Sequence, residues 1–102
     1  MPLISYVITV YNKAEFLPVV ADALKNQRGI EDAEAIFVDD GSTDNSPAVL
    51  QAIVADWPAA RVISQKNSGP ALATNAGIFA ATGKWIKIMD GDDVLHPDAT
   101  RA

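Results

Sequence analysis

The residues best suited to chemistry are two groups of aspartates, and the first of them is Asp90-Gly91-Asp92. In an extended segment alternate side chains point the same way, so both carboxylates would face one ligand. Oxygen ligands of this kind suit a hard divalent cation, Mg²⁺ or Mn²⁺, which keeps positions open for water and phosphate oxygens. Such an ion could neutralise a diphosphate as that group leaves. The alternative interpretation is an acidic turn that precedes Pro97.

The second group lies in the segment DDGSTD, residues 39–44, which contains a glycine and precedes a helix. Its three carboxylates would repel a phosphate unless a cation intervened, so the segment does not suit a phosphate-binding loop. A carboxylate here can instead accept hydrogen bonds from a base imide or from ribose hydroxyls, and we expect Asp40 to do so. We expect Asp44 to satisfy N–H groups of the turn and of the helix start, a role that is also open to Asp39.

Strands and helices that alternate along the chain would position these residues. Continuous or alternating apolar runs predict the strands, and apolar stripes predict the helices. The predicted strands cover residues 3–10, 35–38, 61–64 and 85–89. The predicted helices cover residues 14–26, 46–57 and 71–81. Ser46 is expected to be an N-cap followed by proline at the first helical position.

Three features of the packing are also predicted. The third helix should pack through a face that contains Leu72, Ala76, Phe79 and Ala80. Trp57 and Trp85 should lie in the core. Tyr11 follows the first strand, where its ring could stack on a base, although a residue at the rim of a site is the alternative.

The order of elements predicts a parallel sheet with right-handed connections and the strand order 3-2-1-4. Strands 1 and 4 would then be neighbours whose connections leave in opposite directions, and ligands of open α/β sheets bind at such a point. Polar residues end three of the strands: Tyr11-Asn12 after the first, Asp39-Asp40 after the second and Asp90 after the fourth. These ends should meet at one crevice.

The composition excludes several classes of protein. A net charge of -5 with scattered basic residues argues against binding to nucleic acid. The absence of cysteine excludes disulfides and thiolate metal sites. The N-terminus lacks the features of a signal peptide, and the apolar run at residues 3–10 is too short to span a bilayer. The 102 residues suit one small α/β domain.

Four segments of the chain together resemble motifs of a known protein family: VITVYNK (7–13), FVDDGSTD (37–44), NSGPALATNAG (67–77) and DGDDVLHPD (90–98). In this order and at these spacings they resemble the N-terminal half of family 2 glycosyltransferases. The resemblance implies the GT-A fold, a Rossmann-like three-layer α/β/α sandwich with a mainly parallel sheet, here truncated. Residues 1–102 would be the nucleotide-sugar-binding N-terminal part of the catalytic domain. Thr74 stands where many relatives carry arginine.

The resemblance also implies roles for residues around the donor nucleotide. Thr9, Tyr11 and Asn12 would line the base pocket, with Tyr11 against the nucleobase. Asp40 would accept a hydrogen bond from the base imide, which suggests a UDP-sugar, and Asp39 would lie beside it and support the turn. A further set would act near the ribose, the metal and the closing helix: Asp90, Asp92 and Asn75.

In that last set, Asp90 would approach the ribose or a metal-bound water. Asp92 would be the principal ligand of Mn²⁺ or Mg²⁺ in the D-x-D motif. Asn75 and Gly77 would sit in the helix that closes over the donor.

The implied activity is transfer of a sugar, with inversion, from a nucleotide-diphosphate donor to a hydroxyl of a saccharide, lipid-linked or other acceptor in polysaccharide biosynthesis. The expected location is cytoplasmic; in a longer protein, the inner face of the membrane is the alternative. The catalytic base would lie beyond residue 102, so little transferase activity is expected from these residues alone. An unfinished sheet edge would make a homo-oligomer plausible.

Three alternatives compete with this interpretation. A non-catalytic nucleotide- or metal-binding module would share the pocket and lack turnover. A receiver-like phosphoacceptor domain would require an acidic pair after the first strand, where this chain has Tyr11-Asn12. A nucleotidyltransferase would require a glycine-rich, basic loop at the same place, which is absent.

Overall fold

Strands and helices alternate along the described part of the chain, as the sequence predicts. The computed structural model describes residues 2–26 and 32–90. The strands are β1 (Ile4–Val10), β2 (Ala33–Asp40), β3 (Ala60–Gln65) and β4 (Trp85–Asp90). The helices are α1 (Leu17–Lys25), α2 (Ser46–Val54) and α3 (Pro70–Ala80). No helix in these two ranges is long and apolar enough to cross a membrane.

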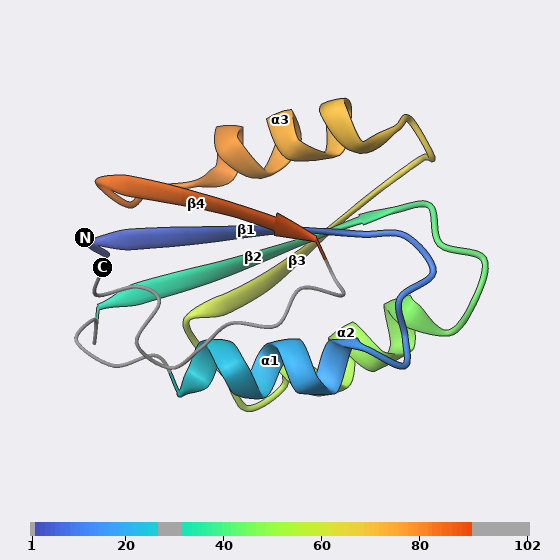
Figure 1. Cartoon of the computed structure of the whole chain (residues 1–102), viewed down its shortest axis with the longest axis horizontal. Helices are drawn as coiled ribbons and strands as arrows, with labels where there is room; N and C mark the ends of the chain where they lie inside the picture. Colours follow the sequence, from blue (N-terminus) through green and yellow to red (C-terminus); the bar gives the residue numbers. More distant parts are fainter. Residues whose placement is uncertain (1, 27–31, 91–102) are drawn as a thin grey trace.

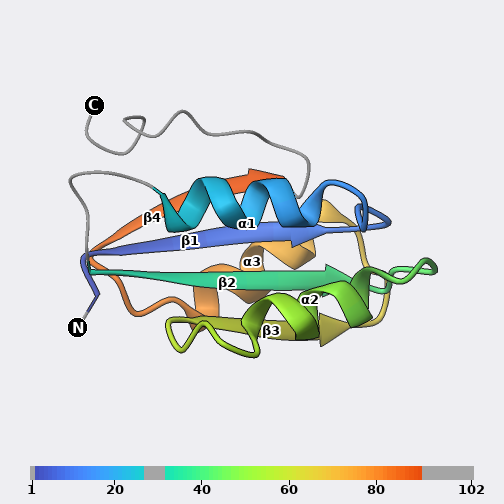
Figure 2. The same ribbon diagram turned by 90° about the horizontal axis from the view of Figure 1, so that it is seen from below.

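The strands form one parallel sheet in the order β3-β2-β1-β4, which confirms the predicted order. Helices α1 and α2 cover one face of this sheet and α3 covers the other, giving three α/β/α layers (Figure 1 and Figure 2). Because all the strands run the same way, their carboxyl ends meet at one edge of the sheet. The predicted convergence of the ends of β1, β2 and β4 is therefore confirmed for the backbone.

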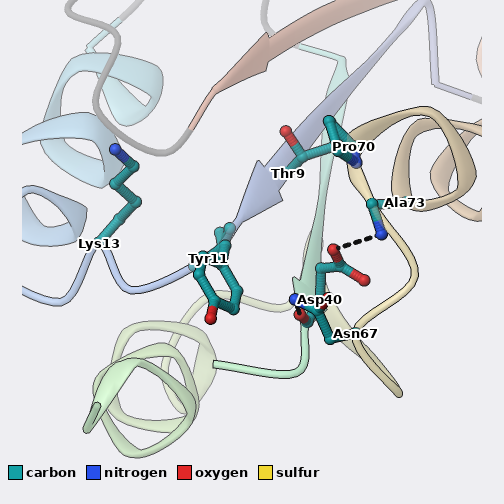
Figure 3. Close-up of a pocket in the computed structure, with 9 residues that line it drawn as sticks. Thr9, Tyr11, Lys13, Asp40, Asn67, Pro70 and Ala73 are labelled. Atoms are coloured by element: carbon teal, nitrogen blue, oxygen red, sulfur yellow. Dashed lines mark hydrogen bonds between the residues drawn. The ribbon is translucent and has the colours of Figure 1, made fainter. Parts of the chain in front are cut away.

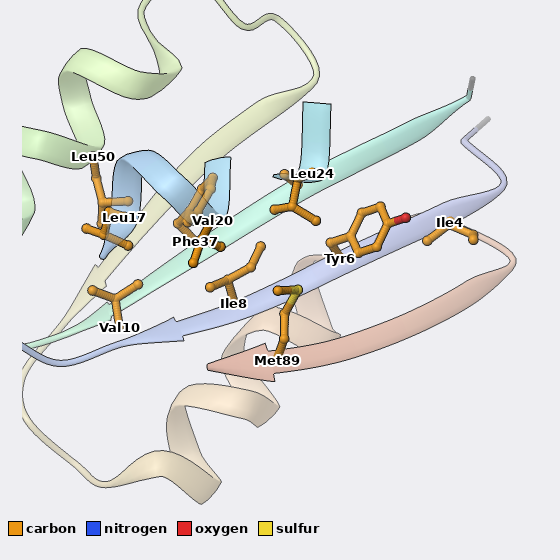
Figure 4. Close-up of a cluster of buried hydrophobic side chains, with 11 residues drawn as sticks. Ile4, Tyr6, Ile8, Val10, Leu17, Val20, Leu24, Phe37, Leu50 and Met89 are labelled. Carbon is orange, nitrogen blue, oxygen red and sulfur yellow. The ribbon is translucent and has the colours of Figure 1, made fainter. Parts of the chain in front are cut away.

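The larger core lies between the sheet and the layer of α1 and α2 (Figure 4). Strand β1 is buried along its whole length, as its continuous apolar run predicts. The ring of Phe37 meets that of Trp57 edge to face, with 6.1 Å between centroids and 70° between planes. The predicted apolar stripes of the first two helices are confirmed by buried side chains that include Leu17, Val20, Leu24 and Leu50.

Helix α3 packs on the sheet through small residues; the predicted packing face was right for Ala76 and Ala80, which pack against this core, and wrong for Leu72 and Phe79. Ala73 and Gly77 are buried, with Ala73 against Ile36 and Val38 of β2. A Cβ atom added to Gly77 would lie 2.2 Å from Cγ1 of Val7, so only glycine allows this close approach. Leu72 and Phe79 are instead exposed, Phe79 by 94%. The spacing of apolar residues is compatible with either face of the helix, and the size of the side chains does not indicate which face packs on the sheet.

Two further predictions require correction. Ser46 is the first residue of α2 and makes no cap; its hydroxyl accepts a hydrogen bond from the Lys13 N–H at 3.0 Å. Trp85 is exposed because it begins β4, which lies at the edge of the sheet. Strand β2 is also longer than predicted, so Asp39 and Asp40 are its last two residues.

A buried carboxylate at the amino ends of the strands holds the connection between α3 and β4. Glu34 accepts hydrogen bonds from the Ser5 hydroxyl and from the Thr82 N–H at 2.7 Å, and it pairs with Arg61 at 3.0 Å. The Ser5 hydroxyl in turn accepts from the Gly83 N–H at 2.8 Å. Burial raises the pKa of Glu34, but hydrogen bonds from Ser5 and Thr82 outweigh it and lower the pKa overall. This cluster fixes where β4 begins.

Candidate functional site

A pocket with a volume of about 440 Å³ opens at the carboxyl ends of the strands. It is bounded by the end of β1, the end of β2 and the start of α3 (Figure 3). This is the edge at which open α/β sheets bind ligands. The residues that line it are Thr9, Val10, Tyr11, Lys13, Asp40, Asn67, Gly69, Pro70 and Ala73.

Asp40 is the buried acid of this pocket, and its carboxylate organises one wall. Its Oδ1 accepts hydrogen bonds from Gln65 Nε2 at 2.9 Å and from the Ser68 N–H at 2.8 Å. Its Oδ2 accepts from the Gly69 N–H at 3.0 Å, and its main-chain carbonyl accepts from Asn67 Nδ2 at 3.0 Å. One residue therefore anchors the connection between β3 and α3.

The same contacts keep Asp40 ionised. The hydrogen bond from Gln65 lowers the pKa of Asp40 most; burial opposes this, and the N–H groups of Ser68 and Gly69 lower it further, so the net shift is downward. The pocket thus presents a negative charge at neutral pH. A ligand group that meets it must offer an N–H or an O–H.

Tyr11 stands on the opposite side of the pocket from this wall and has an exposed ring. Its side chain is 45% exposed, and in Figure 3 it lies between Lys13 and Asp40. Thr9 is nearly buried at the end of β1. An exposed aromatic face beside a buried acceptor is suited to a flat heterocycle that carries a hydrogen-bond donor.

Asn12 lies outside the pocket lining and fastens the end of β1 to the loop after β2. Its backbone has φ of 52°, a left-handed conformation that asparagine tolerates. Its Oδ1 accepts hydrogen bonds from the N–H groups of Thr43 at 2.7 Å and Asp44 at 3.2 Å. Its own N–H donates to the Ser42 hydroxyl at 3.0 Å. Asn12, expected as a nucleotide contact, thus positions the loop beside the pocket.

The remaining acids of residues 39–44 hold the same loop. Asp39 accepts a hydrogen bond from the Ser42 hydroxyl at 2.5 Å, so it supports the turn beside Asp40. Asp44 accepts from the Ser46 N–H at 2.9 Å, which confirms its expected role at the helix start. Gly41 has φ of 71°, and an added Cβ would lie 2.6 Å from the Asn67 N. Glycine is therefore needed where this loop meets the pocket wall.

The sequence profile described as "Glycosyl transferase family 2" matches residues 5–101. The chain belongs to this family. It is 38% identical over 102 residues to the succinoglycan biosynthesis protein ExoO of Rhizobium meliloti (strain 1021), covering 99% of this chain and 28% of ExoO. It is also 38% identical over 99 residues to the chondroitin synthase of Pasteurella multocida (strain Pm70), covering 97% of this chain and 10% of that protein.

Two solved structures share the fold. A mannosyltransferase, PcManGT from Pyrobaculum calidifontis, in complex with GDP-Man and Mn²⁺, superposes with a TM-score of 0.87 at 25% identity; the match covers 96% of this chain and 29% of that one. S. aureus TarS 1-349 in complex with UDP-GlcNAc gives 0.87 at 22% identity, over 97% and 29%. The expected GT-A type of α/β fold is thereby confirmed. The chain spans less than a third of these proteins.

Three other residues of this family 2 domain were expected to bind the donor nucleotide or the metal ion, and none of them is among the described residues that line the pocket. Asn75 is exposed on α3 and outside the pocket lining. The backbone of Asp90 pairs with Thr9, so β4 ends beside the pocket. Asp92 lies outside the described residues. Within residues 2–26 and 32–90, no three acidic or histidine side chains form a group that could hold a metal ion.

Several residues of the site or beside it were not predicted from the sequence: Lys13, Gln65, Asn67, Gly69 and Pro70. The segment NSGP at 67–70 was identified as a turn and as part of a family motif, which is a signal for the pocket wall. Gln65 had no signal of its own, because the length of β3 decides whether it reaches Asp40. The structure pairs these two residues in register.

Proposed function

We propose that residues 1–102 form the donor-binding part of a family 2 glycosyltransferase catalytic domain, and that its donor is a UDP-sugar. The observation that carries the proposal is the pocket itself, which is lined by both the exposed ring of Tyr11 and the ionised carboxylate of Asp40. The family membership of residues 5–101 supports the chemistry.

The nucleobase would lie between β1 and the pocket wall. Tyr11 would stack on its face, and Thr9 would line the floor. Oδ2 of Asp40 accepts one hydrogen bond from Gly69, which leaves it able to accept another from a base N–H. Uracil carries one such N–H in its imide, which is the reason we favour UDP.

The diphosphate would extend from the pocket toward the end of β4. Asp90 and Asp92 would hold Mn²⁺ or Mg²⁺ there, since carboxylates suit hard divalent cations and Asp90 is the last residue of β4, paired with Thr9. The ion would supply positive charge to the departing diphosphate. Lys13, which lines the same pocket, would add a second positive charge. A metal requirement is supported by the mannosyltransferase with 25% identity, whose complex contains Mn²⁺.

In the complete reaction an acceptor hydroxyl would attack the anomeric carbon with inversion. The names of the relatives, a succinoglycan biosynthesis protein and a chondroitin synthase, support a saccharide acceptor. No described residue is assigned as the base that takes the proton from this hydroxyl. We therefore expect residues 1–102 to bind the donor and to show little transfer on their own.

Isothermal titration calorimetry with UDP, with and without Mn²⁺, tests the proposal. Stacking of a base on an aromatic ring contributes about 1–3 kcal/mol, so Tyr11→Ala should weaken UDP binding by about tenfold or more. The exposed Phe79→Ala is the matched control and should bind like the wild type. Binding of UDP that is unchanged in Tyr11→Ala, or absent from the wild type, would contradict the proposal.

A turnover assay then separates an enzyme from a binding module. A chain extended to the length of its relatives should transfer sugar from a UDP-sugar, and residues 1–102 should not. UDP binding without transfer by the extended protein would favour the non-catalytic module.

A further inference from the structure

Gln65 contacts the acid of the pocket without lining the pocket itself. It is the last residue of β3, pairs in register with Asp40 at the end of β2, and is half-buried. Its Nε2 donates to Oδ1 of Asp40 at 2.9 Å. Its side chain therefore reaches Asp40 from outside the pocket lining.

The number of free acceptor positions on Asp40 decides what it can bind. Each carboxylate oxygen accepts about two hydrogen bonds. Oδ1 already accepts two, from Gln65 Nε2 and from the Ser68 N–H. Oδ2 accepts one from described residues, the N–H of Gly69. The carboxylate thus offers a ligand one acceptor position on Oδ2 and none on Oδ1.

Nucleobases differ in what they offer to such a carboxylate. Uracil presents a single N–H between two carbonyl groups. Guanine presents two adjacent N–H donors on its pairing edge, and a carboxylate satisfies both only with one acceptor position on each oxygen. With Oδ1 filled, one of the guanine donors would be left without a partner, which is costly inside a pocket.

We propose that Gln65 is a specificity-determining residue, which fills Oδ1 of Asp40 and so selects a uracil over a guanine donor nucleotide. This inference rests on the proposed function. It adds that the choice of base is made from outside the pocket lining. Gln65 also has a positioning role, because its hydrogen bond and that of the Ser68 N–H hold the same oxygen of the Asp40 carboxylate. The same bond is the largest cause of the lowered pKa of Asp40, which keeps the acceptor charged.

The test compares Gln65→Met with the wild type by calorimetry, with UDP and GDP titrated separately in the presence of Mn²⁺. Methionine keeps the length of the side chain and removes the donor. The wild type should prefer UDP, and the ratio of the two dissociation constants should move toward GDP by about tenfold, the value of one hydrogen bond to a charged group. Gln51→Met on the exposed face of α2 is the matched control and should keep the wild-type ratio.

The ratio separates specificity from a merely structural effect, because a loosened loop would weaken UDP and GDP alike. An unchanged ratio in Gln65→Met, or a wild type that prefers GDP, would overturn the inference and leave nucleotide binding intact. A wild type that binds neither nucleotide would overturn the proposed function instead. Should Gln65→Met fail to fold, Gln65→Asn, whose shorter amide does not reach Asp40, must show the same shift in ratio.

Discussion

Asp40 serves two parts of the molecule with one carboxylate. Towards the protein it accepts the N–H groups of Ser68 and Gly69 and the amide of Gln65, and so shapes the loop that enters α3. Towards the pocket it keeps one acceptor position. Both tasks use the ionised form: its charge strengthens the hydrogen bonds that it accepts from the protein, and a proton on the carboxyl would occupy the one position left for the ligand. Ligand binding and local stability are therefore linked at this residue.

This linkage predicts a stability that depends on pH. The pKa of Asp40 is lowered from 3.8, chiefly by Gln65, and that of Glu34 is lowered from 4.5, as hydrogen bonds outweigh the opposing effect of burial. Below these ordinary values the unfolded chain binds more protons than the folded chain. The stability that these two carboxylates contribute should thus be fully present above their ordinary pKa values. The free energy of unfolding should fall as the pH drops through those values toward the lower pKa values of the folded protein.

Urea denaturation at a series of pH values from 7 to 3 measures this dependence. Asp40→Asn removes one of the shifted carboxylates, so its free energy of unfolding should change less between pH 5 and pH 3 than that of the wild type. Identical pH dependences in the two proteins would show that the contacts of Asp40 do not stabilise its charged form.

At the scale of the elements, the strands and their order could be predicted, while the packing of α3 could not. Continuous apolar runs such as β1 leave little choice, because a strand buried on both faces has few other sequences. In α3 the predicted face included the large residues Leu72 and Phe79, yet the buried residues that contact the sheet are Ala73 and Gly77. Close approach of a helix to a sheet depends on what the strands present, here Val7, and this is a tertiary property.

Gly77 should therefore matter more to stability than Phe79. In Gly77→Ala the new Cβ would lie 2.2 Å from Cγ1 of Val7, so either α3 or the Val7 side chain must shift. Such overpacking typically costs about 1–3 kcal/mol. Phe79→Ala removes an exposed ring and should change the free energy of unfolding by less than about 0.5 kcal/mol. Urea denaturation measures both, and the reverse order would contradict the observed packing.

At the scale of the whole molecule, polar clusters lie at opposite ends of the sheet. The pocket with Asp40 occupies the carboxyl ends, and the cluster around Glu34 occupies the amino ends. The sequence revealed the first through its DDGSTD and NSGP segments. It gave no sign of the second, because Glu34, Arg61 and Thr82 are each ordinary in their own segments and meet only when β2, β3 and the connection after α3 assemble. The predicted metal ligand Asp92 lies outside the described residues and stays a prediction.

Mutations should separate the roles of the two ends of the sheet, with stability affected at the amino ends and UDP binding at the carboxyl ends. Glu34 and Asp40 are six residues apart on β2, which at about 3.3 Å per residue places them about 20 Å apart. Glu34→Gln would put an amide N–H₂ among groups that already donate, and it would lose the ion pair with Arg61. We expect it to lower the free energy of unfolding by about 1–3 kcal/mol.

The affinity of Glu34→Gln for UDP should stay within about twofold of the wild type, because sites this far apart rarely couple. Tyr11→Ala should show the opposite result, with weaker UDP binding and little change in stability, since Tyr11 is nearly half exposed. Calorimetry and urea denaturation of the two variants check this crossed pattern. A Glu34→Gln protein that remained folded but lost UDP binding would show instead that the amino ends of the strands control the pocket through α3 and β4.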